Sequence, residues 1–362
     1  MSSSPCAIGC SGEVSERLKE HDWKSCISTK IGIVGSNPTL SALLLTMILI
    51  TPGCRRPLRE FEERRVLLGT MVNIKVLTGD EKKADRAMDA AFLEIERVDS
   101  LMSRYSQESE LSKLNSTGHS RHRELIRVIA ECKRWGELTD GAFDVTITPL
   151  FELWDFESQR IPEEGDLRRV ADFVDYRKIW VSDSLIQIRE GMEIDLGGAA
   201  KGYAVDRAVD RLENLGIQHA LVDAGGDIRA LGGRGEEPWK IGVKHPRKNG
   251  IFRLIELRDG SVATSGDYEK YFVREGVRYH HILDPRTGYP AKKCVSVTIL
   301  AETAMEADIL ATGVTVLGPD AGARLVESLE GVGALIISEN PEGLSVDELG
   351  RLGNERGKIL QD

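Results

Sequence analysis

Cysteine is scarce in most of this chain, so no disulfide framework can be drawn from it. Four of the six cysteines lie within the first 54 of 362 residues. The two that remain, Cys132 and Cys294, are far too distant in sequence for the C-x-x-C spacing of a zinc or redox site. The sequence therefore predicts neither a set of disulfides nor a metal held by paired cysteines.

A basic excess and a long hydrophobic run are also missing. The net charge of −10 argues against nucleic acid as a partner, because no excess of Lys and Arg is available to neutralise phosphates. The apolar run Leu43–Ile50 has only eight residues, which is too short to span a bilayer. An acidic enzyme that handles a phosphorylated ligand must build a local positive site or recruit a metal cation.

The first 54 residues differ from the rest and are interpreted as a leader. Part of residues 1–40 resembles the translation of a transfer-RNA gene, which predicts that the true translation start lies further along. The apolar run Leu43–Ile50, followed by Gly53 and Cys54, suits a signal peptide with a lipoprotein processing site. Thr51 and Pro52 depart from the usual pattern, and a stray apolar stretch is the alternative. The lipoprotein interpretation predicts a lipid anchor at Cys54.

The body of the chain, residues 61–350, predicts one domain of the α+β (mixed α/β) class, with mixed sheets and surrounding helices. No repeat of fixed period and no linker divides it. A β-branched alternating pattern predicts a strand over Val66–Leu77. Apolar residues at helical spacing predict a helix over Lys82–Met102. Further helices are expected over residues 123–138, Ala199–Ala208 and Ala304–Val316, and a strand over Ala334–Ser338.

The stretch Glu193–Asp206 (E-I-D-L-G-G-A-A-K-G-Y-A-V-D) joins a strand-like end, a glycine pair and a helix start. Main-chain N–H groups at a helix start favour an anion, and Gly197 and Gly198 allow a ligand to approach closely. Lys201 in the first helical turn opposes the helix dipole unless an anion lies beside it. An ordinary tight turn with a solvated lysine is the alternative, and neighbouring motifs must decide.

Two further stretches carry polar groups suited to chemistry on phosphates. Asp308 and Thr312 are four residues apart on a predicted helix, so both side chains lie on one face and offer the oxygen ligands that Mg²⁺ prefers. A favourable interaction of Asp308 with the helix dipole and a bond from Thr312 to a main-chain carbonyl would explain the same residues. His281, beside the turn that begins at Asp284, is a candidate general base. His280 would face the other way in a strand, and a purely structural histidine is the alternative.

Eight motifs in order resemble the ApbE family of FAD:protein FMN transferases. They are L-G-T at Leu68–Thr70, S-E-L-S-K-L-N at Ser109–Asn115, G-A-F-D-V-T-I-T-P-L at Gly141–Leu150, D-L-G-G-A-A-K-G-Y-A-V-D at Asp195–Asp206, A-L-V-D-A-G-G-D-I-R-A-L-G at Ala220–Gly232, A-T-S-G-D-Y at Ala263–Tyr268, H-I-L-D-P-R-T-G-Y-P at His281–Pro290, and M-E-A-D-I-L-A-T at Met305–Thr312. Leu68 stands where the family usually has Met, and Asp223 where it commonly has Asn.

The resemblance implies Mg²⁺-dependent transfer of FMN from FAD to a Ser or Thr hydroxyl of a target flavoprotein, through a phosphoester bond and with release of AMP. It implies that Gly198 (through its carbonyl), Asp308 and Thr312 hold Mg²⁺ or Mn²⁺. The catalytic residues it implies are Lys201 beside the pyrophosphate and His281 as proton acceptor.

The remaining expectations concern FAD and the partner. The resemblance implies that FAD lies against Leu68, Tyr105, Ala142, Phe143, Asp144, Lys201 and His281. The acceptor is expected to carry a D-G-A-T/S motif, and the protein to lie in the cell envelope, at the periplasmic face of the inner membrane. An FAD pyrophosphatase that yields FMN and AMP, and a non-catalytic flavin-binding lipoprotein, are the two alternative functions.

Overall fold

The computed structural model describes residues 57–354. The predicted leader, with Cys54 and the apolar run before it, lies outside the described residues. Among residues 57–354, no helix combines the length and the apolar character needed to cross a bilayer.

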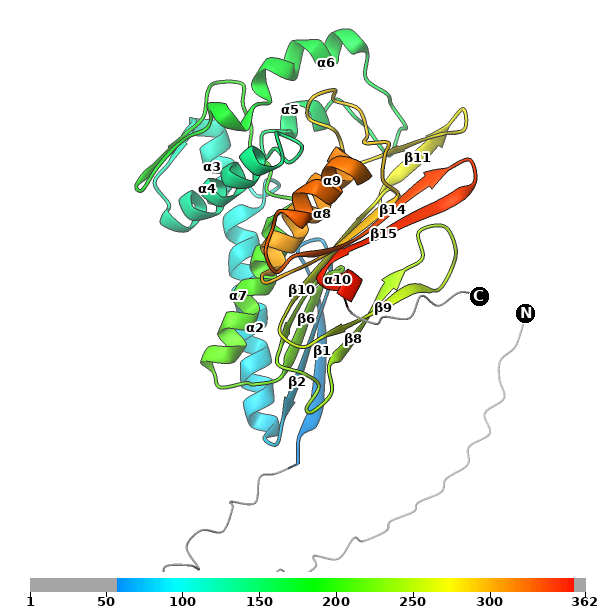
Figure 1. Cartoon of the computed structure of the whole chain (residues 1–362). Helices are drawn as coiled ribbons and strands as arrows, with labels where there is room; N and C mark the ends of the chain where they lie inside the picture. Colours follow the sequence, from blue (N-terminus) through cyan, green and yellow to red (C-terminus); the bar gives the residue numbers. More distant parts are fainter. Residues whose placement is uncertain (1–56, 355–362) are drawn as a thin grey trace, which may run out of the picture. The chain divides into compact units, whose positions relative to one another are not determined.

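An eight-stranded antiparallel sheet forms the centre of the domain (Figure 1). In spatial order its strands are β1 (Arg59–Leu67), β2 (Thr70–Thr78), β6 (Ala220–Ala224), β7 (Asp227–Leu231), β10 (Gly260–Gly266), β13 (Ser296–Ala301), β14 (Gly333–Asn340) and β15 (Gly343–Gly350). The strands follow one another in chain order, but residues 79–219 lie between β2 and β6, so the sheet unites segments that are distant in sequence.

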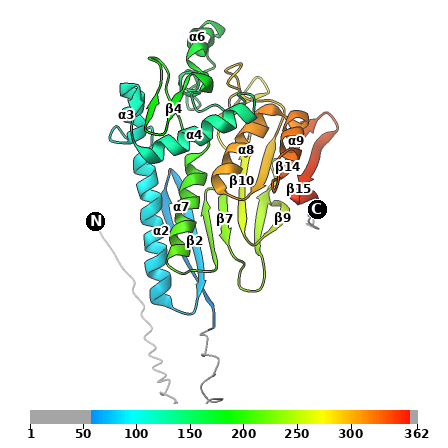
Figure 2. The same cartoon turned by 60° about the vertical axis from the view of Figure 1, so that its left-hand side comes forward.

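Helices cover one face of this sheet (Figure 2). From one sheet edge to the other they are α2 (Glu81–Met102), α7 (Ala200–Asn214), α8 (Ala304–Leu317) and α9 (Pro319–Glu327). Asp80 caps α2 by accepting a hydrogen bond from the N–H of Lys83, and the apolar side chains of this helix are buried as its 3.6-residue period predicts. The predicted helix over Lys82–Met102 is confirmed, and α7 extends six residues beyond the predicted end at Ala208.

The opposite face of the sheet is covered by the hairpin β8 (Trp239–Lys244) and β9 (Ile251–Leu257). Its inward side chains pack with residues such as Leu300 of β13 and Leu335 of β14. Because helices lie on one face and this hairpin on the other, all six residues of β13 are buried. Helices gathered on one face of an antiparallel sheet define the α+β class, so the predicted fold class is confirmed.

A smaller layer of helices and strands lies beyond one end of the sheet, at the top of Figure 2. It contains α3 (Glu110–Thr117), α4 (Arg123–Leu138), α5 (Thr148–Phe151), α6 (Glu164–Val170), η2 (Ala171–Phe173), η3 (Tyr176–Lys178) and the sheet β3 (His119–Ser120), β5 (Leu185–Gln187) and β4 (Trp180–Ser182). The hairpin β11 (Tyr271–Arg274) and β12 (Val277–His280) and the short α10 (Arg351–Asn354) complete the described elements.

The prediction of one strand over Val66–Leu77 is wrong. The chain reverses at Leu68 and Gly69, where both residues have positive φ values of 54° and 70°. Leu67 and Thr70 pair across this two-residue turn, which has the backbone twist that matches a right-handed hairpin. Leucine is rare in the left-handed region, so the residue types at the turn did not reveal it. Leu68 therefore lies at the tip of a hairpin.

Candidate active site

The glycine turn before α7 is held in place by Asp195. Its Oδ1 accepts the N–H of Gly197 at 2.8 Å, and its Oδ2 accepts Nη1 of Arg104 at 3.2 Å. Among the described residues no side chain caps α7 at Ala199, and the N–H groups of Ala199 and Ala200 both donate to the carbonyl oxygen of Leu196. A methyl group at Gly198 would lie 3.2 Å from the ring of Phe143 and 3.4 Å from Thr312 Oγ1. The turn and α8 thus meet at Gly198.

Lys201 lies between two buried carboxylates. Its ammonium group forms an ion pair with Asp227 of β7, and Nζ lies 3.5 Å from Oδ2 of Asp308. Burial opposes the charged form of Lys201, but the two carboxylates outweigh it and hold its pKa above the usual range. Burial raises the pKa of Asp308, Asp227 adds to that rise, and Lys201 opposes it. The ammonium group of Lys201 therefore links a carboxylate of the sheet, Asp227, to a carboxylate of α8, Asp308.

Asp308 and Thr312 lie on the same side of α8, as their spacing predicts. Asp308 Oδ2 lies 3.4 Å from the N–H of Gly202 in the first turn of α7. Thr312 Oγ1 lies 3.4 Å from Ser265 Oγ, at the end of β10. The carboxylate, the hydroxyl and the Gly198 backbone thus come together where α7, α8 and β10 meet.

His281 follows β12 directly and is half-buried. Its Nδ1 lies 3.3 Å from the carbonyl oxygen of Lys270, which favours the tautomer with the proton on Nδ1 and an accepting Nε2. Burial first, and then the neighbouring His280, Lys270 and Lys201, lower the pKa of His281 to about 4. The imidazole is therefore neutral at pH 7 and lies within electrostatic reach of Lys201.

His280 has a different environment. It is buried, one ring nitrogen contacts the carbonyl oxygen of Ala291, and the other accepts the N–H of Ile282. Both nitrogens are thus used within the protein, which leaves His281 as the available histidine of the pair.

Comparisons with known proteins bear on what this site does. Residues 68–336 match the model of the ApbE family. The chain belongs to the ApbE family. The FAD:protein FMN transferase of Vibrio cholerae is 35% identical over 317 residues, which cover 83% of this chain and 93% of that protein. The FAD:protein FMN transferase of Haemophilus influenzae is 32% identical, with 79% and 88% covered.

Solved structures of ApbE proteins agree with this assignment. The ApbE protein from Thermotoga maritima superposes with a TM-score of 0.73 at 37% identity and covers 80% of this chain and 97% of its own. The flavin transferase ApbE from Vibrio cholerae superposes with a TM-score of 0.73 at 31% identity, with 82% and 99% covered. The family and the fold predicted from the motifs are confirmed.

The ApbE resemblance also assigns Leu68, Tyr105 and the segment Ala142–Asp144 to FAD. Leu68 is half-buried at the tip of the β1–β2 hairpin. A methyl group at Gly225 would lie 2.5 Å from Thr70 Oγ1, so this tip packs on the turn that leads into Asp227. Tyr105 is 83% exposed, with the guanidinium of Arg104 5.2 Å from its ring centre. Arg104, the neighbour of Tyr105, also bonds to Asp195, which supports the glycine turn.

The segment Ala142–Asp144 lies behind that turn. Ala142 and Phe143 are buried, and the Phe143 ring faces Gly198. The Asp144 carboxylate accepts the N–H and hydroxyl of Thr146 through Oδ1 and the N–H of Tyr176 through Oδ2. Asp144 therefore holds the local backbone in shape, and the sequence did not reveal this use of its carboxylate.

Asp227 is the functional candidate that the sequence analysis missed. It lies in the motif A-L-V-D-A-G-G-D, directly after the Gly225–Gly226 turn, and it is 3% exposed. Its position after a glycine turn was a signal, but its contact with Lys201 depends on the pairing of β6 with β7 beside α7. The sequence gives no measure of that proximity.

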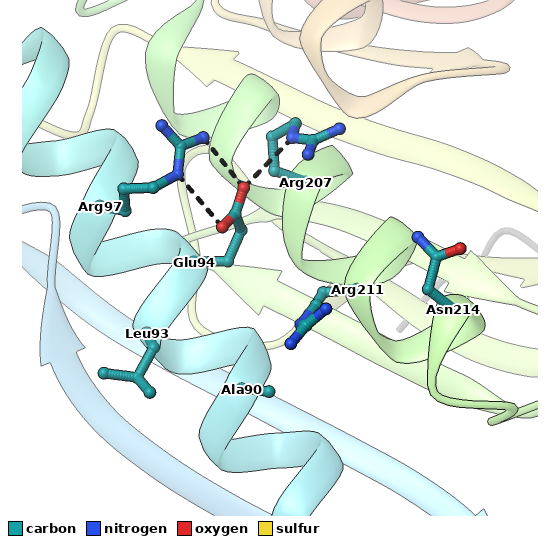
Figure 3. Close-up of a pocket in the computed structure, with 7 residues that line it drawn as sticks. All are labelled: Ala90, Leu93, Glu94, Arg97, Arg207, Arg211 and Asn214. Atoms are coloured by element: carbon teal, nitrogen blue, oxygen red, sulfur yellow. Dashed lines mark hydrogen bonds and ion pairs between the residues drawn. The ribbon is translucent and has the colours of Figure 1, made fainter.

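A surface groove of about 370 Å³ lies elsewhere, between α2 and α7. It is lined by Ala90, Leu93, Glu94, Arg97, Arg207, Arg211 and Asn214. Figure 3 shows Glu94 bonded to both Arg97 and Arg207 at this groove. None of the predicted site residues lines it, so the groove is separate from the centre around Lys201.

Proposed function

We propose that this protein transfers FMN from FAD to a Ser or Thr hydroxyl of an acceptor flavoprotein and releases AMP. The observation that carries the proposal is the convergence of Gly198, Lys201, Asp308 and Thr312 at the uncapped start of α7. A diphosphate needs cationic partners, and this arrangement offers the Lys201 ammonium group next to oxygen donors that could hold a divalent cation. Membership of the ApbE family supports the same activity.

The donor set suits a divalent cation that also binds phosphate oxygens. In the described part of the chain, no three His, Cys, Asp or Glu side chains gather in a way that could hold a metal. One carboxylate from Asp308, the Thr312 hydroxyl and the Gly198 carbonyl leave positions for water and a diphosphate, as Mg²⁺ or Mn²⁺ prefers. When bound, such an ion would neutralise charge on the phosphate oxygens.

Lys201 and His281 supply the remaining functions. The Lys201 ammonium, held by Asp227, can bind a non-bridging oxygen of the diphosphate. The oxygen of the acceptor hydroxyl attacks the phosphorus of the FMN half, and Nε2 of the neutral His281 accepts the proton of that hydroxyl. The new P–O bond replaces the bond to the bridging oxygen, which leaves with AMP.

The pocket for FAD is proposed to include Leu68, Tyr105 and the segment Ala142–Asp144. Two features support this: the β1–β2 tip packs on the turn before Asp227, and Phe143 faces Gly198. The exposed ring of Tyr105 offers a stacking surface for a flavin or an adenine.

An acceptor assay tests the activity. The protein is incubated with FAD, Mg²⁺ and a flavoprotein domain that carries a D-G-A-T/S motif, with and without a chelator, and in-gel flavin fluorescence is read. We expect a fluorescent acceptor only without the chelator. Free FMN and AMP with no labelled acceptor would indicate an FAD pyrophosphatase, and intact FAD would indicate a flavin-binding protein.

Two variants test the assigned residues in that assay. His281→Ala is expected to lower transfer by about 10²- to 10⁴-fold, the usual contribution of a general base, whereas the exposed His119→Ala serves as the matched control. Asp308→Ala should abolish Mg²⁺-dependent transfer, with the exposed Asp320→Ala as control. Full activity of the first variant, or unchanged Mg²⁺ dependence of the second, would contradict the assigned roles.

The location in the cell is proposed from the leader alone. An apolar run followed by Gly53 and Cys54 supports a lipid anchor, which would hold the enzyme at the periplasmic face of the inner membrane. Cys54→Ala should then move the protein from the membrane fraction to the soluble fraction. Equal fractionation of both forms would refute the anchor.

A further inference from the structure

Helices α7 and α8 cross in close contact at Gly202. A methyl group at this position would lie 2.3 Å from the carbonyl oxygen of Ala304 and 2.7 Å from Cα of Met305. The first turns of the two helices are therefore in direct backbone contact. Any change in how they cross moves Asp308 relative to Lys201.

Each helix donates N–H groups of its first turn to a carboxylate of the other. Asp206, four residues after Gly202, accepts the N–H of Ala304 at 2.8 Å and that of Met305 at 2.9 Å. Asp308, four residues after Ala304, accepts the N–H of Gly202 at 3.4 Å. Asp206 on α7 therefore contacts the start of α8 in the same way as Asp308, the proposed metal ligand on α8, contacts the start of α7.

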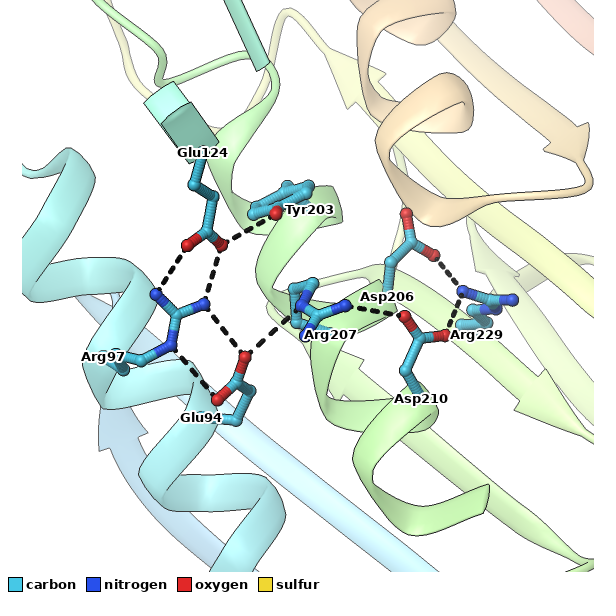
Figure 4. A network of polar contacts seen from close by, with 8 residues as sticks. All are labelled: Glu94, Arg97, Glu124, Tyr203, Asp206, Arg207, Asp210 and Arg229. Carbon is cyan, nitrogen blue, oxygen red and sulfur yellow. Dashed lines mark hydrogen bonds and ion pairs between the residues drawn. The ribbon is translucent and has the colours of Figure 1, made fainter. Parts of the chain in front are cut away.

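Arg229 connects this crossing to the sheet. Its Nη1 lies 2.8 Å from Asp206 Oδ1 and 3.6 Å from Asp210 Oδ1 (Figure 4). Arg229 lies two residues after Asp227 on β7, so the two side chains leave the strand on the same face. The three elements joined by Asp206 and Arg229 are therefore α7, α8 and β7, which carry Lys201, Asp308 and Asp227.

We propose that Asp206 and Arg229 are positioning residues, which hold the start of α8 against α7 and β7 and so set the geometry of the metal donors. Asp206 is buried and both of its carboxylate oxygens are engaged with N–H groups. It touches neither Lys201 nor the proposed donors, and it acts through the backbone of α8. The inference rests on the proposed function for its effect on transfer, but its effect on metal binding can be measured separately.

The polar network of Figure 4 contains a matched control. Arg207 lies on α7, the helix that carries Asp206. Like Arg229, it forms an ion pair with Asp210, but its other partner is Glu94 of α2. It has no contact with α8 among the interactions of the described residues. Removing Arg207 therefore disturbs the same network without loosening the start of α8.

The test measures Mn²⁺ affinity by electron paramagnetic resonance, without FAD, for the full chain and the variants Asp206→Asn, Arg229→Met, Arg229→Lys and Arg207→Met. Loss of residues that orient metal ligands usually weakens metal binding by about 10- to 100-fold. We expect a weakening in this range for Asp206→Asn and Arg229→Met, a smaller one for Arg229→Lys, and a change below about twofold for Arg207→Met. The thermal midpoint of each variant is recorded alongside.

The outcomes separate the inference from the proposed function. Unchanged Mn²⁺ affinity in Asp206→Asn and Arg229→Met would overturn the positioning role while leaving the metal site intact. An equal loss in Arg207→Met at an equal drop in thermal midpoint would also overturn it, because the effect would then be general destabilisation. Failure of the unmodified protein to bind Mn²⁺ would refute the metal site itself. If Asp206→Asn does not fold, the Mn²⁺ affinities of Arg229→Lys and Arg207→Met are compared, and weaker binding by Arg229→Lys alone would support the positioning role.

Discussion

The close crossing of α7 and α8 predicts that Gly202→Ala damages activity more than stability. The added methyl group would lie 2.3 Å from the carbonyl oxygen of Ala304 and 2.6 Å from its carbonyl carbon. Because comfortable contacts between such atoms begin near ~3.5 Å, the helices must move apart by about 1 Å. The obstructing atoms belong to the backbone of α8, so no side-chain rotation can relieve the contact.

Two opposing terms set the effect on stability. Overpacking of a tight contact costs about 1 to 3 kcal/mol, whereas replacing Gly by Ala inside a helix returns about 1 kcal/mol. The net loss of unfolding free energy should therefore be about 0 to 2 kcal/mol. The site is more sensitive, since a displacement of about 1 Å in a catalytic group can lower the rate by about 10²-fold.

The matched control is Gly165→Ala, in α6. No atom lies within 4 Å of a methyl group at Gly165, so the same chemical change meets no obstacle there. Transfer to the acceptor is measured by flavin fluorescence, and stability by urea denaturation. We expect about 10²-fold slower transfer for Gly202→Ala and unchanged transfer for Gly165→Ala. Wild-type transfer by Gly202→Ala would show that the α7–α8 spacing does not control the site.

Three further predictions follow from charged groups. Asp227→Asn removes a carboxylate that holds Lys201, so transfer should fall by about 10-fold or more; an unchanged rate would contradict that role. The pKa of His281 is lowered to about 4, below the unfolded value of about 6.5. The contribution of His281 to the free energy of unfolding is therefore present above pH 6.5 and is lost as pH falls toward 4. Denaturation curves of wild type and His281→Ala should diverge over that range. Arg253 is buried with Glu348 at 2.8 Å, so Arg253→Ala should lower the unfolding free energy by about 3 kcal/mol. The double variant Arg253→Met with Glu348→Leu should have nearly the wild-type free energy of unfolding in urea denaturation. An equal loss of unfolding free energy in Arg253→Ala and in the double variant would contradict this explanation.

The local sequence pattern was sufficient to predict the helices whose apolar residues recur at helical spacing. The apolar spacing of α2 and the residues around α8 predicted both helices, since a helix that covers a sheet must bury one face. The i, i+4 spacing of Asp308 and Thr312 placed both on one side of α8 before any tertiary information. The glycine pair before α7 likewise indicated a turn at a helix start. These inferences depend on neighbours in sequence, and the structure agrees with them.

Contacts between distant segments could not be read in this way. The turn at Leu68 and Gly69 is stabilised by the pairing of β1 with β2, and Gly69 was the single residue-type signal for it, so it was missed. The sequence likewise did not reveal that Thr146 and Tyr176 bond to both carboxylate oxygens of Asp144. Asp227 was overlooked because its importance arises only beside Lys201, 26 residues earlier in the chain.

The amino-acid sequence by itself determined the family, the class of fold and the residue types that suit phosphate chemistry, because motif order and periodicity are local properties. The tertiary structure decided which of those residues share a centre. It joined α7, α8 and β7 through the backbone contact at Gly202 and the bonds of Asp206 and Arg229. A carboxylate acquires its function from the charges and N–H groups that folding brings within a few ångströms, and sequence spacing does not specify those distances.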